Sequence, residues 1–202
     1  MRGILLCGGQ SRRMGQKKQW LPFGDRPLLL HTLDQLYKTC GDVVVVASDE
    51  EERERLARLH VNAILDQYPG QGPLAGLHAG LSGLQGEEWA CLVACDLPFF
   101  RGEILQDLAM LAEEDRAAQA VVPCDGEQLF PVCALYRGQA RQIAASCLED
   151  GQRALRQFLQ RLQVRYVPAE RYASYRPFPF HNMNTIEEYE FARALWKKEG
   201  WS

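Results

Sequence analysis

Short apolar runs alternate with amphipathic stretches along the first half of the chain. Four runs have the length and continuity of strands that are covered on both faces. They lie at residues 4–7, 43–46, 63–65 and 90–95. Between them, apolar residues recur at helical spacing over residues 28–38, 50–59 and 74–81, with Leu56 and Leu59 expected to face inward. This order predicts a parallel sheet with right-handed helical crossovers.

The second half continues the pattern with one change. Helices are expected at 104–111, 141–147 and 153–162, and strands at 120–122 and 164–167. The turn Asp125-Gly126 leads to an apolar run at 131–136, which we expect to add to the sheet in antiparallel orientation. Residues 168–180 are rich in proline and aromatics and read as a mobile loop, and Thr185 is placed to cap a final helix.

These elements predict an α/β fold with three αβα layers, a Rossmann-like sheet that is mostly parallel with an antiparallel addition. At 202 residues and 47% hydrophobic content, one domain spanning 1–202 is expected. A net charge of −3 argues against duplex nucleic acid as a partner. No apolar run approaches 18 residues, so we expect neither a membrane span nor a signal peptide.

Seven cysteines are scattered along the chain, mostly inside apolar runs. That placement is typical of buried free thiols and indicates a reducing, cytoplasmic location. Cys91 and Cys95 are four residues apart, but no Cys-x-x-Cys or His-x-x-His pair accompanies them, which disfavours a zinc site.

A basic, glycine-rich segment follows the first predicted strand. Gly8, Gly9 and Gly15 enclose it, and residues 2–26 contain six Lys or Arg against one acid, Asp25. Backbone N–H groups and the charges of Arg12, Arg13 and Lys18 suit a phosphate site. The alternative is a turn with a solvated basic edge. Neither Gly-x-x-x-x-Gly-Lys-Ser/Thr nor Gly-x-Gly-x-x-Gly is present.

Polar residues follow other predicted strands. Asp66 opens a glycine-rich loop, and Asp96 comes directly after the run at 90–95. Because ligands of parallel sheets lie beyond the carboxyl ends of the strands, Asp96 is a candidate magnesium ligand. Its alternative role is a helix N-cap. The alternative for Asn182 and Asn184 is ordinary turn chemistry.

Four motifs together resemble the molybdenum cofactor guanylyltransferase family of nucleotidyltransferases. The first runs from Leu6-Cys7-Gly8-Gly9 through Arg12-Arg13-Met14-Gly15 to Lys18, Leu21 and Arg26-Pro27-Leu28. The others are Gly72-Pro73-Leu74-Ala75-Gly76-Leu77, Cys95-Asp96-Leu97-Pro98 and Phe180-His181-Asn182-Met183-Asn184-Thr185. Together they extend over almost the whole chain.

The resemblance implies transfer of GMP from GTP to the terminal phosphate of the molybdenum-pterin cofactor, with Mg²⁺ and release of pyrophosphate. It implies catalytic roles for Arg13, Lys18 and Asp96, with Asp96 as metal ligand, and acceptor binding by Asn182 and Asn184. Residues 1–100 would bind nucleotide and 101–202 the acceptor. Partner proteins would deliver the cofactor or mature molybdoenzymes. The implied nucleotide-binding residues are Leu6, Cys7, Gly8, Gly9, Arg12, Gly15, Lys18, Ser48, Asp66, Gly76 and Asp96.

The chain departs from the family pattern at four positions. Lys17 stands where Asp is common, Trp20 for leucine, Ser48 for asparagine and Cys7 for alanine. Lys17 and Lys18 could therefore share the phosphate contact.

Three other functions stay open on the sequence. The first is cytidylyl transfer to the same pterin, although those relatives usually read Leu-Ala-Ala-Gly where this chain has Gly8. The second is nucleotidyl transfer to a sugar phosphate. The third is nucleotide sensing without turnover, against which the combination of Arg13, Lys18 and Asp96 argues.

Overall fold

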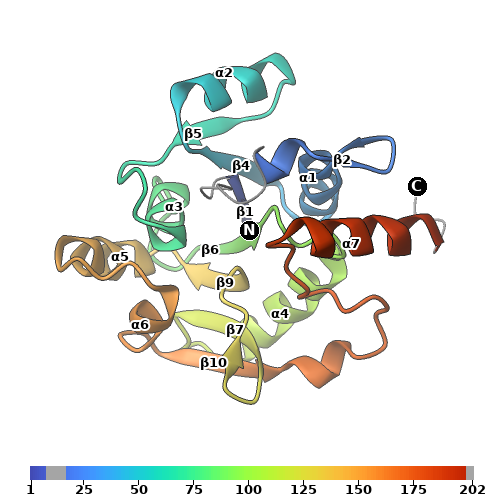
Figure 1. Ribbon diagram of the computed structural model, residues 1–202. Coiled ribbons are helices and arrows are strands. Elements are labelled where there is room, and N and C mark those ends of the chain that lie inside the picture. Colours follow the sequence, from blue (N-terminus) through green and yellow to red (C-terminus); the bar gives the residue numbers. More distant parts are fainter. Residues whose placement is uncertain (8–16, 199–202) are drawn as a thin grey trace.

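The computed structural model describes residues 1–7 and 17–198 and shows a three-layer α/β architecture (Figure 1). Within these residues, eight strands form one sheet in the order β10-β7-β9-β6-β1-β4-β5, with β8 paired to β7. The strands are β1 (Arg2–Cys7), β4 (Asp42–Ala47), β5 (Ala63–Leu65), β6 (Trp89–Ala94), β7 (Ala120–Asp125), β8 (Gln128–Leu129), β9 (Cys133–Arg137) and β10 (Val164–Pro168).

The sheet is mixed, as predicted. β1 pairs in parallel with β4 and β6, β4 with β5, and β7 with β10. β9 is antiparallel to both β6 and β7, which confirms the predicted antiparallel addition. Gly126, with a φ of 57°, makes the tight turn between β7 and β8.

Helices cover both faces because side chains of each strand alternate between them. Ile4 and Leu6 of β1 pack on the face of α3 (Pro73–Gly80), α5 (Ala140–Glu149) and α6 (Leu155–Leu159). Leu5 and Cys7 pack on the other face, with α1 (Leu28–Thr39), α2 (Glu50–Arg58) and α4 (Gly102–Glu114). The predicted parallel core with crossover helices is confirmed.

Helix α3 lies very close to β1, and glycine makes this possible. A Cβ at Gly80 would meet Cγ2 of Ile4 at 2.4 Å, and one at Gly76 would meet Cδ2 of Leu6 at 2.5 Å. Both partner side chains are buried. We therefore assign Gly76 a packing role against the strand that precedes the glycine-rich segment.

Gly80→Ala is expected to lower the free energy of unfolding by about 1–3 kcal/mol, because the buried Ile4 has no space into which to move. Urea denaturation would measure it. Gly41→Ala is the matched control, since a Cβ at Gly41 meets nothing within 4 Å. Unchanged or increased stability of the Gly80 variant would contradict the packing argument.

The C-terminal helix α7 (Ile186–Lys198) packs against an N-terminal hairpin, β2 (Pro22–Phe23) and β3 (Arg26–Pro27), and against α1 (Figure 1). The ring centroids of Phe23 and Trp196 are 4.7 Å apart, and the Tyr189 hydroxyl donates to the carbonyl of Pro22 at 2.5 Å. This packing brings the segment before α7 to the residues that follow the glycine-rich segment.

The structure corrects two local expectations. Leu59 is 45% exposed, and the inward-facing residues of α2 are Leu56 and Glu52. The segment 168–180 is only partly a loop: it begins with a short 3₁₀ helix, η2 (Ala169–Tyr172), and Ala169, Tyr172 and Phe180 pack in the core. The aromatic side chains of Tyr172 and Phe180 bury apolar area, which holds these parts of the segment against the core.

Candidate functional site

The carboxyl ends of four parallel strands lie at one edge of the sheet. Cys7 pairs with Ala47, Ala47 with Leu65, and Leu6 with Ala94. Ser48, Asp66 and Asp96 therefore leave the sheet at the same edge, as the strand and helix order predicted. Asp66 and Asp96 are three strand spacings apart, or about 14 Å along the edge.

Asp96 has a carboxylate oxygen that is shielded from solvent at this edge. Its side chain is 24% exposed, yet Oδ1 is shielded from solvent and has no hydrogen-bond partner among the described residues. The N-cap alternative is wrong, because α4 begins at Gly102 and Arg101 occupies the cap position. A shielded carboxylate oxygen needs a partner, either a hydrogen-bond donor or a cation.

Lys18 lies beside Asp96. Its Nζ donates to the carbonyl of Met183 at 2.7 Å and to Oδ1 of Asn184 at 3.1 Å, and it is 3.8 Å from Oδ2 of Asp96. The backbone N–H of Met183 in turn donates to the carbonyl of Asp96 at 3.0 Å. The site thus joins three distant parts of the chain: η1 (Lys18–Trp20), the end of β6 and the segment before α7.

Burial raises the pKa of Asp96, and the Lys18 ammonium offsets only part of that effect. Glu188 adds a smaller repulsion in the same direction. The Glu188 carboxylate accepts from the N–H groups of Asn184 and Thr185, while the Thr185 hydroxyl accepts from the Glu188 N–H at 3.2 Å. This reciprocal cap confirms the N-cap prediction for Thr185 and orients Asn184.

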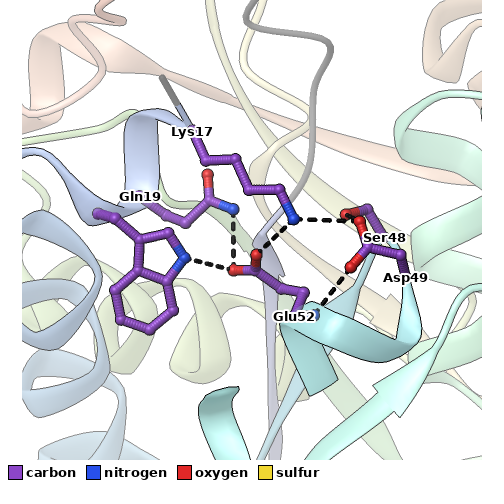
Figure 2. Close-up of polar contacts among 6 residues, drawn as sticks. Lys17, Gln19, Ser48, Asp49 and Glu52 are labelled. Atoms are coloured by element: carbon purple, nitrogen blue, oxygen red, sulfur yellow. Dashed lines mark hydrogen bonds and ion pairs between the residues drawn. The ribbon is translucent and has the colours of Figure 1, made fainter. Parts of the chain in front are cut away.

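Lys17 points toward Asp49 and Glu52 of the α2 region (Figure 2). Its Nζ binds Oδ2 of Asp49 at 3.0 Å and Oε2 of Glu52 at 2.8 Å. Burial alone would lower the pKa of Lys17, but the hydrogen bonds to Glu52 and Asp49 outweigh it and the pKa is raised. The Lys17 ammonium is therefore paired with the carboxylates of Asp49 and Glu52. Lys18 is the lysine that faces Asp96.

A pocket of about 490 Å³ opens beside Asn184. Asn182 and Asn184 line it together with His181 and Glu188. An aromatic wall completes it, formed by Phe130, Phe178 and Phe180, with Phe130 stacked on Phe180 at 4.7 Å. The pocket combines flat apolar surface with amide groups, which suits a planar, polar ligand.

The remaining predicted nucleotide contacts are spread over the edge. Asp66 is half-buried, and its Oδ1 accepts from the N–H of Tyr68 at 2.8 Å. Burial raises its pKa, partly offset by that hydrogen bond. Ser48 is exposed and donates to Asp49 at 3.0 Å. Leu6 and Cys7 are buried in β1, so any contact they make with a nucleotide is through the backbone.

Five predicted contacts, Gly8, Gly9, Arg12, Arg13 and Gly15, lie outside the described residues. The predicted phosphate cradle stays a prediction.

The described side chains include no group of three or more His, Cys, Asp or Glu that could hold a metal ion. A cation at Asp96 would take its remaining oxygen ligands from phosphates and water, an arrangement that magnesium favours. Oδ1 of Asp96, which is shielded and accepts from no donor in residues 1–7 and 17–198, fits such a ligand. None of the helices in the described ranges is both long and apolar enough to cross a membrane.

Sequence reasoning missed several residues of the site. Phe180 and Met183 lie within the fourth motif, but the sequence assigned neither a role. Phe130 and Phe178 join them only through tertiary packing. Glu52 did carry one, since Asp49-x-x-Glu52 has the spacing of a capping box. The Asp49 carboxylate does accept from the Glu52 N–H at 2.8 Å, but the Glu52 side chain turns to residues 17–20.

The sequence is similar to a family of known proteins. Residues 3–166 match the MobA-like NTP transferase domain. A molybdenum cofactor guanylyltransferase of Desulfosudis oleivorans is 32% identical over 200 residues, which cover 96% of this chain and 95% of that protein. A probable molybdenum cofactor guanylyltransferase of Bacillus anthracis is 32% identical over 189 residues, or 93% of this chain and 92% of that one.

A solved structure agrees with the sequence comparisons. Molybdopterin-guanine dinucleotide biosynthesis protein A from Archaeoglobus fulgidus superposes with a TM-score of 0.86 at 28% identity. The match covers 98% of this chain and 100% of that one.

Proposed function

Because the chain belongs to the family of MobA-like NTP transferase domains, we propose that it transfers GMP from GTP to the molybdenum-pterin cofactor (molybdopterin) and releases pyrophosphate. It is a nucleotidyltransferase, and its relatives named molybdenum cofactor guanylyltransferase match nearly its full length. The observation that carries the proposal is the position of Asp96, whose shielded Oδ1 has no hydrogen-bond partner in the part of the chain that the structure describes, beside the Lys18 ammonium.

Asp96 would hold the divalent cation, and Mg²⁺ fits its hard carboxylate oxygen. The cation, when bound, neutralises charge on phosphate oxygens. Lys18 lies next to Asp96 and would supply a second positive charge, which stabilises negative charge that develops on the leaving pyrophosphate. Arg13 and the backbone around Gly8 and Gly9 would hold the triphosphate, as the sequence motif implies.

The reaction asks little of a general base. A terminal phosphate is already ionised at neutral pH and can attack the α-phosphate directly. Catalysis then depends on alignment of the two substrates and on charge neutralisation. Asp96, at the end of β6, and Lys18, held by Met183 and Asn184, are placed to contribute to both.

The two substrates would occupy different parts of the edge. The nucleotide would extend from Asp66, at the base or ribose, toward Asp96 at the phosphates. The acceptor would lie in the pocket lined by Asn182 and Asn184, with its pterin against the aromatic wall. This division gives the first half of the chain to the nucleotide and the second to the acceptor.

The seven cysteines are all free, and six of them are buried. They suit a reducing compartment, so we place the enzyme in the cytoplasm. There it would meet proteins that deliver the cofactor or mature molybdoenzymes.

We expect selectivity for GTP, because the motif carries Gly8 where cytidylyl relatives usually have alanine. Pyrophosphate release would be measured with GTP, CTP and ATP, each with and without molybdopterin. GTP should give the highest kcat/KM, and release should require the pterin.

Equal or better use of CTP would replace the guanylyl assignment with the cytidylyl one. Release that requires a sugar phosphate would assign that acceptor class instead. Tight nucleotide binding without turnover on any acceptor would indicate a nucleotide sensor.

A further inference from the structure

Glu52 is a buried carboxylate that binds one short segment three times. It is 1% exposed and lies in the first turn of α2. Oε1 accepts from Nε2 of Gln19 at 3.0 Å and from Nε1 of Trp20 at 2.7 Å, and Oε2 accepts from Nζ of Lys17 at 2.8 Å (Figure 2). Both carboxylate oxygens are therefore satisfied by residues 17–20.

Lys18 is the member of that segment whose side chain does not turn to Glu52. Its Nζ reaches the carbonyl of Met183 and the side chain of Asn184, next to Asp96. The segment is a single 3₁₀ turn, so its side chains diverge to opposite sides of one short backbone. Holding three of the four residues on α2 fixes the backbone from which Lys18 projects.

The fold alone does not require this arrangement. Helix α2 already has its N-cap in Asp49 and its core contact in Leu56. Burying a carboxylate costs free energy that an apolar side chain would not. Arg55 covers Trp20 from the same helix, with its guanidinium carbon 3.6 Å from the ring centroid.

Two of these contacts come from positions that depart from the motif described above. Lys17 and Trp20 are positions at which its motif departs from the family pattern, and both donate to Glu52. Both departures thus contribute to the same contact with Glu52. Glu52 pairs with the Lys17 ammonium, whereas the Lys18 ammonium points toward Asp96.

We infer that Glu52 is a positioning residue for the reaction: by clamping Lys17, Gln19 and Trp20 it sets the backbone that directs Lys18 toward Asp96. The inference rests on the proposed function, since it assigns Glu52 an effect on turnover through Lys18. An error of about 1 Å at a charge-stabilising group costs up to about a hundredfold in rate.

The test is a double-mutant cycle on pyrophosphate release from GTP and molybdopterin. Glu52→Gln keeps the shape of the side chain and removes its charge. It should lower kcat about tenfold with less than about a threefold change in the KM for GTP. In a Lys18→Ala background the same substitution should change kcat less than about twofold, because its effect passes through Lys18.

Two further variants keep the test decisive. Glu51→Gln makes the same charge change at the exposed neighbouring position and should leave kcat unchanged. Trp20→Phe removes one donor and retains a ring beneath Arg55, so it should lower kcat severalfold even if Glu52→Gln folds poorly. Its effect should also disappear in the Lys18→Ala background.

The outcomes separate the two proposals. If the wild-type enzyme is inactive with these substrates, the proposed function fails and takes this assignment with it. If the wild type is active and Glu52→Gln retains its kcat, only the positioning role fails. Equal, additive losses with and without Lys18 would show a purely structural role and overturn the inference.

Discussion

Asp96→Asn is expected to reduce pyrophosphate release by a hundredfold or more while leaving the fold intact. The substitution keeps the shape of the side chain but removes the charge that would hold the divalent cation and face the triphosphate. The measurement is kcat across a Mg²⁺ titration, together with a melting curve of the same preparation.

The melting temperature should stay the same or rise. Burial raises the pKa of Asp96 above its unfolded value, so the charged form is disfavoured in the folded protein. For an acid, a raised folded pKa means that ionisation at neutral pH subtracts from stability. Removing that charge therefore relieves a cost, and a loss of activity without a loss of stability identifies a functional carboxylate.

Asp42→Asn is the matched control, because Asp42 opens β4 at the opposite edge of the sheet and is half-exposed. It should leave turnover unchanged. Near-normal activity of Asp96→Asn at ordinary Mg²⁺ would rule out Asp96 as the metal ligand. Recovery only at high Mg²⁺ would support the assignment, since a weakened site is refilled by mass action.

Lys18→Ala and Lys17→Ala are expected to differ strongly in their effect on kcat. Lys18→Ala should lower kcat by about a hundredfold or more, because Lys18 supplies the positive charge beside Asp96. Lys17→Ala should lower kcat far less but destabilise the protein by about 1–2 kcal/mol, because buried Glu52 loses its charged donor.

The two lysines differ by one position, so each variant controls for the other. Steady-state kinetics and urea denaturation on both proteins measure the two quantities. If Lys17→Ala loses turnover and Lys18→Ala retains it, Lys17 is the lysine that contacts the phosphates. The assignment of Lys18 to the phosphates would then be wrong.

The edge that carries the site could be predicted from local pattern. Each apolar run has a length and continuity typical of buried strands, and the helical stretches between them require parallel neighbours. Parallel strands end at one edge, so the position of Asp96 after the run at 90–95 followed from the order of the elements. The registers of β1, β4, β5 and β6 confirm it.

The spacing of apolar residues was less informative where a polar side chain is buried. Helix α2 reads as a charged surface helix, and its sequence favoured Leu59 as a core residue. The structure exposes Leu59 and buries Glu52, because three donors from residues 17–20 satisfy the carboxylate. Hydropathy alone contains no information about such distant donors.

The sequence by itself determined the layers, the sheet edge, the antiparallel strand and the motifs that indicate nucleotidyl transfer. Only the tertiary structure decided which lysine faces Asp96, that Asn184 lies beside it, and that an aromatic pocket opens there. These contacts join Lys18 to a residue 166 positions away, through the packing of α7 on the N-terminal hairpin. Local patterns record which face of an element is buried, whereas the partner across an interface depends on how complete elements pack.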